Sequence, residues 1–67
     1  MNIKEQFGAK LKRLRLEKGL SQEKLALKSG IDRTYLPGIE KGERNVSIEV
    51  LERLAKALDL KPSQLLE

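Results

Sequence analysis

The 67-residue chain has no cysteine, no histidine and no tryptophan, and its aromatic residues are one phenylalanine and one tyrosine. Without cysteine, it forms neither a disulfide framework nor a thiolate metal site. Without histidine, it lacks the side chain best suited to general-base chemistry near neutral pH and most common among metal ligands. We therefore predict no metal site, no cofactor and no histidine-dependent catalysis.

Long hydrophobic runs are also absent. The longest stretch without a charged residue, Thr34 to Ile39, is six residues long, whereas a membrane-spanning helix needs about 20 apolar residues. No signal-peptide pattern precedes it. The chain has no glycine-rich phosphate loop, and its carboxylates are scattered instead of paired. These absences predict a soluble, cytoplasmic, non-enzymatic protein with no membrane partner and no small-molecule ligand.

Positive charge is concentrated at the start of the chain. The formal net charge is +4, and residues 1–24 hold seven Lys or Arg against three Glu, whereas residues 25–67 hold seven of each sign. A surplus of this size fits a polyanionic partner, and it fits equally well a charge that keeps a small domain soluble. The length predicts one domain, residues 1–67, that buries only about 60% of its unfolded surface. Dimerisation is the expected additional source of stability.

The middle of the chain has the pattern of two short helices joined by a tight turn. Ser21 is a typical N-cap for a helix over 22–29, and Gly30 ends that helix because glycine tolerates positive φ. Asp32 provides a second N-cap, and Gly42 closes the second helix. The pattern predicts a helix-turn-helix whose inward residues are Leu25, Ala26, Ile31, Leu36 and Ile39.

Three further helices are predicted around this pair. Asn2 and Glu5 form a capping-box variant at the start of the first, which Gly19 ends; Ser47 caps the fourth; a proline opens a last short helix over 62–66. Helical spacing assigns the inward faces of the first and fourth helices to Ile3, Phe7, Leu11 and Leu14, and to Ile48, Leu51, Leu54, Ala55 and Leu58. The fold class is therefore predicted to be all-α, with five helices in one compact domain.

The motifs SQEKLA, GID, RTYL and IEKG followed by RN resemble the Cro/C1-type helix-turn-helix family of DNA-binding regulators over nearly the whole chain. Within it, GIDRTYLPGIEKGERN is most similar to the controller proteins of restriction-modification systems, which are small dimeric transcription regulators. The resemblance implies a lambda-repressor-like fold and a homodimer on a pseudo-palindromic double-stranded DNA operator with half-sites ~34 Å apart. It also implies control of the protein's own promoter and of an adjacent endonuclease gene.

The family resemblance assigns the DNA contacts by position in the second helix of the motif. That helix enters the major groove, so Arg33 is expected to contact guanine and Thr34 to contact a neighbouring base, with Gly38 on the same base-reading face. Tyr35 has two evenly matched interpretations, a phosphate contact or partial burial. The expected phosphate-contacting residues are Gln22, Tyr35, Lys41, Arg44 and Asn45.

Two residues match family positions that are structural. An Arg near the end of the first helix and a Glu near the end of the recognition helix commonly form a buried ion pair in this family, and Arg15 and Glu40 occupy these positions. We expect them to hold the fold together instead of contacting DNA, because removing one partner of such a pair leaves a buried charge.

Pro37 departs from the family pattern, which usually has serine or another helix-compatible residue at this position. A proline inside a helix removes one backbone hydrogen bond and clashes with the carbonyl four residues earlier, here that of Arg33. The recognition helix is either bent or begins only at Pro37, leaving residues 33–36 irregular. We favour a bent but helical segment anchored by Leu36 and Ile39.

A second copy of the chain is the expected occupant of one apolar surface. Val50, Leu65 and Leu66 have little of the domain left to cover them once the first four helices have packed, so we assign them to a symmetric dimer interface. The alternative is that the terminal leucines fold back onto their own core.

Other functions remain open from sequence alone. A phage-type repressor or an antitoxin would share the same fold, although antitoxins usually carry additional sequence for the toxin. A protein-interaction adaptor would share it as well, because a fold does not dictate a function. An adaptor would show no salt-dependent retention on DNA.

Overall fold

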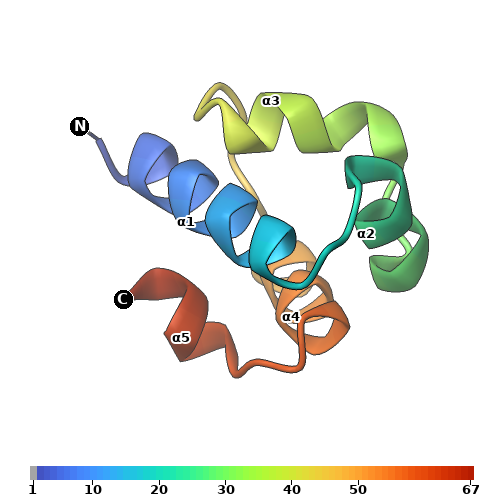
Figure 1. Ribbon diagram of the computed structural model, residues 1–67. Helices are drawn as coiled ribbons and strands as arrows, with labels where there is room; N and C mark the ends of the chain where they lie inside the picture. The colour runs from blue at the N-terminus through green and yellow to red at the C-terminus, as the bar shows by residue number, and fades with distance from the viewer. Residues whose placement is uncertain (1) are drawn as a thin grey trace.

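In the computed structural model, which describes residues 2–67, the chain folds into five α-helices and one short 3₁₀ helix (Figure 1). The elements are α1 (Ile3–Glu17), α2 (Gln22–Ser29), the 3₁₀ helix η1 (Arg33–Tyr35), α3 (Leu36–Glu40), α4 (Ile48–Ala57) and α5 (Pro62–Leu66). Helix α1 contacts α3 and α5, and α2 contacts α3 and α4. In Figure 1, α3 lies above α1 and α5 lies below it. The all-α, five-helix prediction is confirmed.

Local capping interactions fix where the helices begin. The Asn2 side chain accepts from the Glu5 backbone N–H at 2.9 Å, and the Glu5 carboxylate accepts from the Asn2 N–H at 3.1 Å, which completes the predicted capping box. Ser21 and Ser47 cap α2 and α4 through their hydroxyls. Gly30 ends α2 with φ of 72°, a left-handed conformation that side chains disfavour. The start signals read from the sequence are therefore confirmed.

The hydrophobic core joins all of the α-helices. The buried apolar residues are Phe7, Leu11, Leu25, Ala26, Leu36, Ile39, Leu54, Ala55, Ala57, Leu58 and Leu65. Leu14, Ile31, Val50 and Leu51 pack against this core while remaining partly exposed.

Leu65 is not available to a partner, which corrects its assignment to the dimer interface. Only 1% of it is exposed, because α5 turns back along α1 and carries this side chain into the core. Leu66, one residue on, points about 100° away around the helix and is 55% exposed. The alternative that a terminal leucine covers its own core is confirmed for Leu65 and not for Leu66.

Two residues predicted to lie on inward helix faces are on the surface instead. Ile3 is 68% exposed and Ile48 is 84% exposed, although helical spacing placed each on an inward face. Both are the first residue of their helix. Periodicity gives the direction of a side chain and not how far the covering elements reach.

Gly8 marks the closest approach between α1 and α3. A Cβ atom at this position would meet the backbone carbonyl oxygen of Ile39 and lie 2.6 Å from that of Glu40. Because backbone atoms cannot move aside cheaply, α3 can seat against α1 only if residue 8 has no side chain. This contact sets the distance between α3 and α1.

Candidate DNA interface

The recognition segment is helical on both sides of Pro37. Residues Arg33–Tyr35 form η1 and residues Leu36–Glu40 form α3, with Tyr35 and Leu36 both in the right-handed helical region. Pro37 has no backbone N–H to donate to the Arg33 carbonyl. That carbonyl accepts from the Leu36 N–H instead, in the tighter 3₁₀ pattern. The segment is helical, as predicted, and residues 33–36 are not irregular. Its α-helical part nevertheless begins only at Leu36, with Pro37 in the first turn, which is within one residue of the start that the alternative predicted.

Asp32 caps the start of this segment. One carboxylate oxygen accepts both the Thr34 backbone N–H at 2.9 Å and the Thr34 hydroxyl at 2.8 Å. These two hydrogen bonds from Thr34, the backbone one first, lower the pKa of Asp32 below its ordinary value of 3.8, with a further contribution from the neighbouring charge of Arg33. The Thr34 hydroxyl therefore has a donor bond already made and retains acceptor capacity.

Arg33 lies at the exposed start of η1. Its guanidinium donates to the Glu23 carboxylate of α2 at 2.8 Å, and both side chains are about 70% exposed. The sequence analysis missed this pair, because a separation of ten residues across a turn has no helical periodicity. An exposed ion pair of this kind is weak, so the Arg33 guanidinium can exchange Glu23 for a stronger hydrogen-bonding partner.

Tyr35 and Arg44 stack on the same surface. The guanidinium carbon of Arg44 lies 5.0 Å from the centre of the Tyr35 ring, within the range of a cation–π interaction. Tyr35 is 48% exposed, so the alternative of partial burial holds for part of its ring. Lys41 and Asn45, the other predicted phosphate contacts of this region, are exposed.

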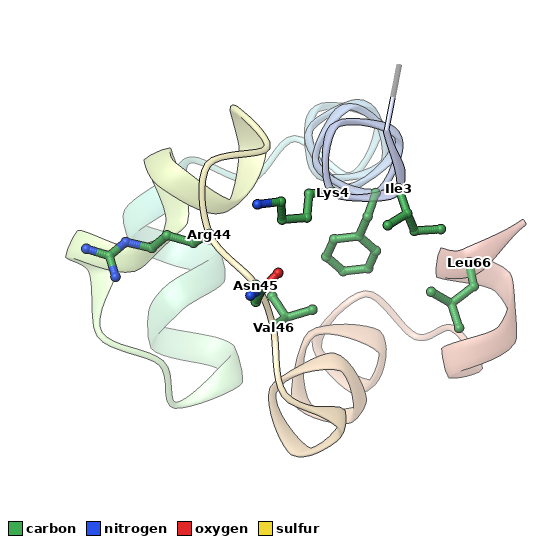
Figure 2. Close-up of a pocket in the computed structure, with 7 residues that line it drawn as sticks. Ile3, Lys4, Arg44, Asn45, Val46 and Leu66 are labelled. Carbon is green, nitrogen blue, oxygen red and sulfur yellow. The ribbon is translucent and has the colours of Figure 1, made fainter.

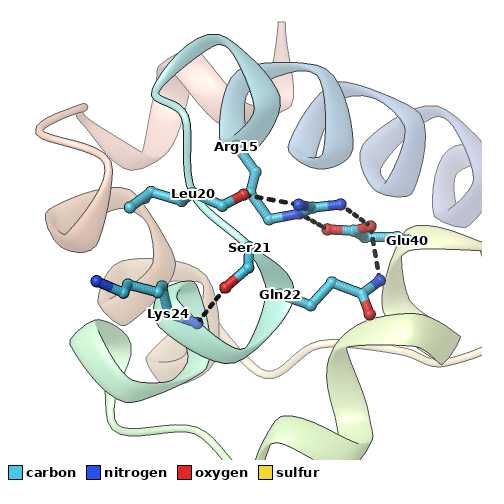
Figure 3. A network of polar contacts seen from close by, with 6 residues as sticks. All are labelled: Arg15, Leu20, Ser21, Gln22, Lys24 and Glu40. Carbon is cyan, nitrogen blue, oxygen red and sulfur yellow. Dashed lines mark hydrogen bonds and ion pairs between the residues drawn. The ribbon is translucent and has the colours of Figure 1, made fainter.

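The opposite side of the recognition segment is anchored by a buried ion pair (Figure 3). Arg15 Nε donates to Glu40 Oε2 at 2.7 Å, and Nη2 donates to Oε1 at 3.1 Å. A third guanidinium bond, from Nη1, reaches the Leu20 carbonyl at 2.7 Å. Arg15 is 7% exposed and Glu40 is 9% exposed, so their predicted pairing is present and shielded from water.

Gln22 joins this network, which the sequence analysis did not predict. Its side-chain nitrogen donates to Glu40 Oε1 at 3.0 Å, linking the first residue of α2 to the last residue of α3 (Figure 3). The hydrogen bond to Glu40 therefore fixes the orientation of the Gln22 side chain. Within residues 2–67, no buried side-chain nitrogen or oxygen atom lacks a hydrogen-bond partner.

A shallow apolar cavity of about 170 Å³ adjoins the predicted DNA-binding surface at Arg44 and Asn45 (Figure 2). It is bordered by α1, α5 and the loop between α3 and α4, and its lining residues are Ile3, Lys4, Phe7, Arg44, Asn45, Val46 and Leu66. None of the helices within residues 2–67 has both the length and the hydrophobicity needed to cross a membrane.

Comparison with known proteins assigns the fold to a family. The helix-turn-helix family HTH_3 matches residues 11–65. The chain belongs to the Cro/C1-type helix-turn-helix family. It is similar to the control protein C.BamHI of Bacillus amyloliquefaciens, with 46% identity over 98% of this chain and 83% of that protein.

Two solved structures extend the comparison. The restriction-modification controller protein C.AhdI from Aeromonas hydrophila superposes with a TM-score of 0.89 and 52% identity over 91% of this chain and 92% of its own. The biofilm regulator SinR, solved in complex with DNA, superposes with a TM-score of 0.87 and 39% identity over 91% and 98% of the two chains. The chain is therefore a non-enzymatic, DNA-binding helix-turn-helix regulator, similar to restriction-modification controller proteins.

The predicted base-reading residues lie in two different elements of the recognition segment. Of the predicted base-reading residues, Arg33 and Thr34 share the exposed start of η1, whereas Gly38 lies on α3 and presents no side chain. Arg44, predicted as a loop contact, lies over Gly38, with its Cδ 3.1 Å from where a Cβ would be. No sequence signal revealed this, because the contact joins a loop to a helix through a missing side chain.

Proposed function

We propose that this chain binds a pseudo-palindromic operator as a homodimer and, like a restriction-modification controller protein, governs its own promoter and that of an adjacent endonuclease gene. It would act in the cytoplasm, where its DNA target is located. The observation that carries this proposal is the exposed η1 face, on which the Asp32 cap orients Thr34 beside Arg33. In a helix-turn-helix, the first residues of the second helix lie against base edges in the major groove.

The proposal assigns base reading to Arg33 and Thr34. A guanidinium on an exposed, short helix can make two parallel bonds to guanine O6 and N7, and exchanging Glu23 for guanine replaces a weak exposed ion pair with a directional contact. Phosphate positioning falls to Tyr35, Lys41, Arg44 and Asn45 on η1 and in the loop after α3, and to Gln22 with the backbone N–H groups at the start of α2. The Gln22 side chain already donates one hydrogen bond to Glu40, and its amide has a second N–H to give.

The dimer surface that we propose retains Val50 and Leu66. Val46 lines both the cavity that Leu66 borders and a second hollow that Val50 borders, so Val46 links the apolar residues of α4 and α5. Arg44 and Asn45 line both hollows as well, so the proposed dimer surface adjoins two of the proposed phosphate contacts. Ile3, exposed at the start of α1, adds to the apolar residues of this surface. A second copy seated here by two-fold symmetry would cover these apolar residues and set the spacing of two recognition segments.

Selection from a random double-stranded DNA pool at near-physiological salt tests both parts. We expect recovery of a two-fold symmetric motif with half-sites about one helical turn apart. Failure to recover any motif, with only weak salt-sensitive binding, would overturn operator recognition; absence of binding altogether would favour a protein-interaction adaptor.

The dimer is tested separately by sedimentation. We expect Leu66→Lys to yield monomers and to reduce selection to half-sites, because a lysine ammonium cannot be buried unpaired at a symmetric contact. Leu27→Lys is the control, since Leu27 is an exposed leucine on α2, 81% exposed against 55% for Leu66, and lines neither hollow. A parent chain that sediments as a monomer at every concentration would contradict the dimer.

A further inference from the structure

We propose that Gly38 is a positioning residue: its lack of a side chain holds Arg44 across the recognition segment, over Tyr35, in the orientation that meets DNA. The proposal rests on the DNA-binding face described above and adds to it the residue that sets where Arg44 lies. Gly38 has no side chain with which to contact DNA, and in this proposal it acts through Arg44.

The geometry shows what a side chain at residue 38 would displace. An ideal Cβ would lie 3.1 Å from Arg44 Cδ, 3.2 Å from Cγ and 3.2 Å from Nε. The Arg44 stem therefore runs directly over Gly38, and its guanidinium continues to the Tyr35 ring, 5.0 Å away. In Figure 2, the Arg44 side chain leaves its loop on the side opposite to Ile3 and Leu66.

The backbone does not require glycine at this position. Gly19, Gly30 and Gly42 have φ between 69° and 79°, which favours glycine, whereas Gly38 lies inside α3 without a positive φ. Glycine in a helix interior is less stable than alanine. Its use here opposes the stability of α3, and the atoms that occupy the freed space belong to Arg44.

Gly8 provides the contrast that separates a positioning role from a packing role. A Cβ on Gly8 would meet the backbone of α3, whereas the three atoms nearest to a Cβ on Gly38 all belong to the flexible Arg44 side chain. A displaced Arg44 also has space to enter, because it borders a hollow of about 220 Å³ with Tyr35 and Val50. Gly38→Ala should therefore fold and change the position of Arg44.

Preorganisation is the physical benefit of this arrangement. A long arginine side chain that is already held before binding loses less conformational freedom when it meets a phosphate or a groove edge. Stacking on Tyr35 holds the guanidinium without neutralising its charge. Displacing it would leave the charge present but no longer aligned with the recognition segment.

The test compares the parent chain, Gly38→Ala, Arg44→Ala and the double variant. Without DNA, nuclear magnetic resonance should show the Arg44 Hδ protons shifted by the Tyr35 ring current in the parent and shifted less in Gly38→Ala. The chain has one tyrosine and no tryptophan, so tyrosine fluorescence offers a second probe of the same contact. The melting temperature of Gly38→Ala should equal or exceed that of the parent.

DNA binding by the same four proteins completes a double-mutant cycle, with a random-sequence 20-base-pair duplex as the probe. Arg44→Ala should reduce the slope of log Kobs against log salt by about one. Gly38→Ala should weaken binding by less, and it should have no further effect once Arg44 is alanine. An unchanged Arg44 proton shift in Gly38→Ala, or an equal loss of affinity in the Arg44→Ala background, would overturn the proposal. If the parent chain binds no DNA at low salt, the proposed function fails, and the proton shifts alone still decide the positioning of Arg44.

Discussion

The two faces of the η1–α3 segment are built in opposite ways. On the inner face, Glu40 is buried and shares its carboxylate between Arg15 and Gln22, while Leu36 is fully enclosed. On the outer face, Arg33 and its ion-pair partner are about 70% exposed and joined by a single hydrogen bond. Removing a partner from a buried ion pair is costly, whereas an exposed pair contributes little.

This difference separates stability from recognition within eight residues of chain, Arg33 to Glu40. The inner side chains fix the segment on α1 and α2, so the outer side chains can be chosen for DNA without supporting the fold. The comparison predicts that substitutions on the inner face act first on unfolding, and that those on the outer face act first on binding.

Glu40→Ala should have the largest effect. It leaves the Arg15 guanidinium buried with the Leu20 carbonyl as its remaining acceptor, and breaking such a pair costs about 3–5 kcal/mol. A domain of this size has a total stability of roughly 3–10 kcal/mol, so the variant should be largely unfolded or close to it. Urea denaturation followed by circular dichroism measures the loss, with exposed Glu43→Ala as control. Equal midpoints for the two variants would refute the anchoring role.

Arg33→Ala should have the next largest effect, and on binding alone. Losing a two-bond contact to guanine should cost about 1–3 kcal/mol of preference at one base pair and leave the melting temperature nearly unchanged. The measurement is competition between the selected operator and single-base variants at fixed salt. A loss that is uniform across all variants would make Arg33 a phosphate contact instead of a base reader.

Helix boundaries were predictable from local signals, because a cap or a left-handed glycine acts within a few residues. Ser21, Gly30 and Ser47 were all assigned correctly on that basis. Leu65 and Leu66 were not distinguished, since only the path of α5 along α1 decides which of two adjacent leucines is covered.

The candidate site was predictable where the family pattern names a position, and not where tertiary contacts decide. The Arg15–Glu40 pair was anticipated from that pattern, and the structure brings the two side chains together. The helical path through Pro37 was harder to predict, because it relies on a 3₁₀ hydrogen bond from the Leu36 N–H to the Arg33 carbonyl. The space that Arg44 occupies over Gly38 exists only in three dimensions.

Glu23→Gln sharpens the comparison through the exposed ion pair. The change removes a negative charge from the DNA-facing surface and frees the Arg33 guanidinium, while the stability should change by less than about 1 kcal/mol. We expect tighter binding to random-sequence duplex at low salt, with the gain shrinking as salt rises. Glu52→Gln, an exposed change on α4, is the control. Weaker binding of the Glu23 variant would show that the carboxylate itself contacts a base.

The smallest expected effect concerns Asp32, which caps the start of the recognition segment. The pKa of Asp32 is lowered in the folded chain by its bonds from Thr34, so the ionised form favours folding. By linkage, this contribution is fully present above the ordinary pKa of 3.8 and is lost as the pH falls through the lower value of the folded state. Asp32→Asn retains an oxygen that can accept from Thr34 but carries no charge.

The difference in the free energy of unfolding between parent and Asp32→Asn should therefore narrow as the pH falls from about 6 to about 2.5. Urea midpoints measured across that range test it. Asp59→Asn is the matched control, because Asp59 follows α4 instead of capping the start of a helix. If the difference in the free energy of unfolding between the parent and Asp32→Asn stays constant with pH, the charge of Asp32 does not stabilise the fold. The Asp32 side chain would then orient Thr34 through its hydrogen bonds alone.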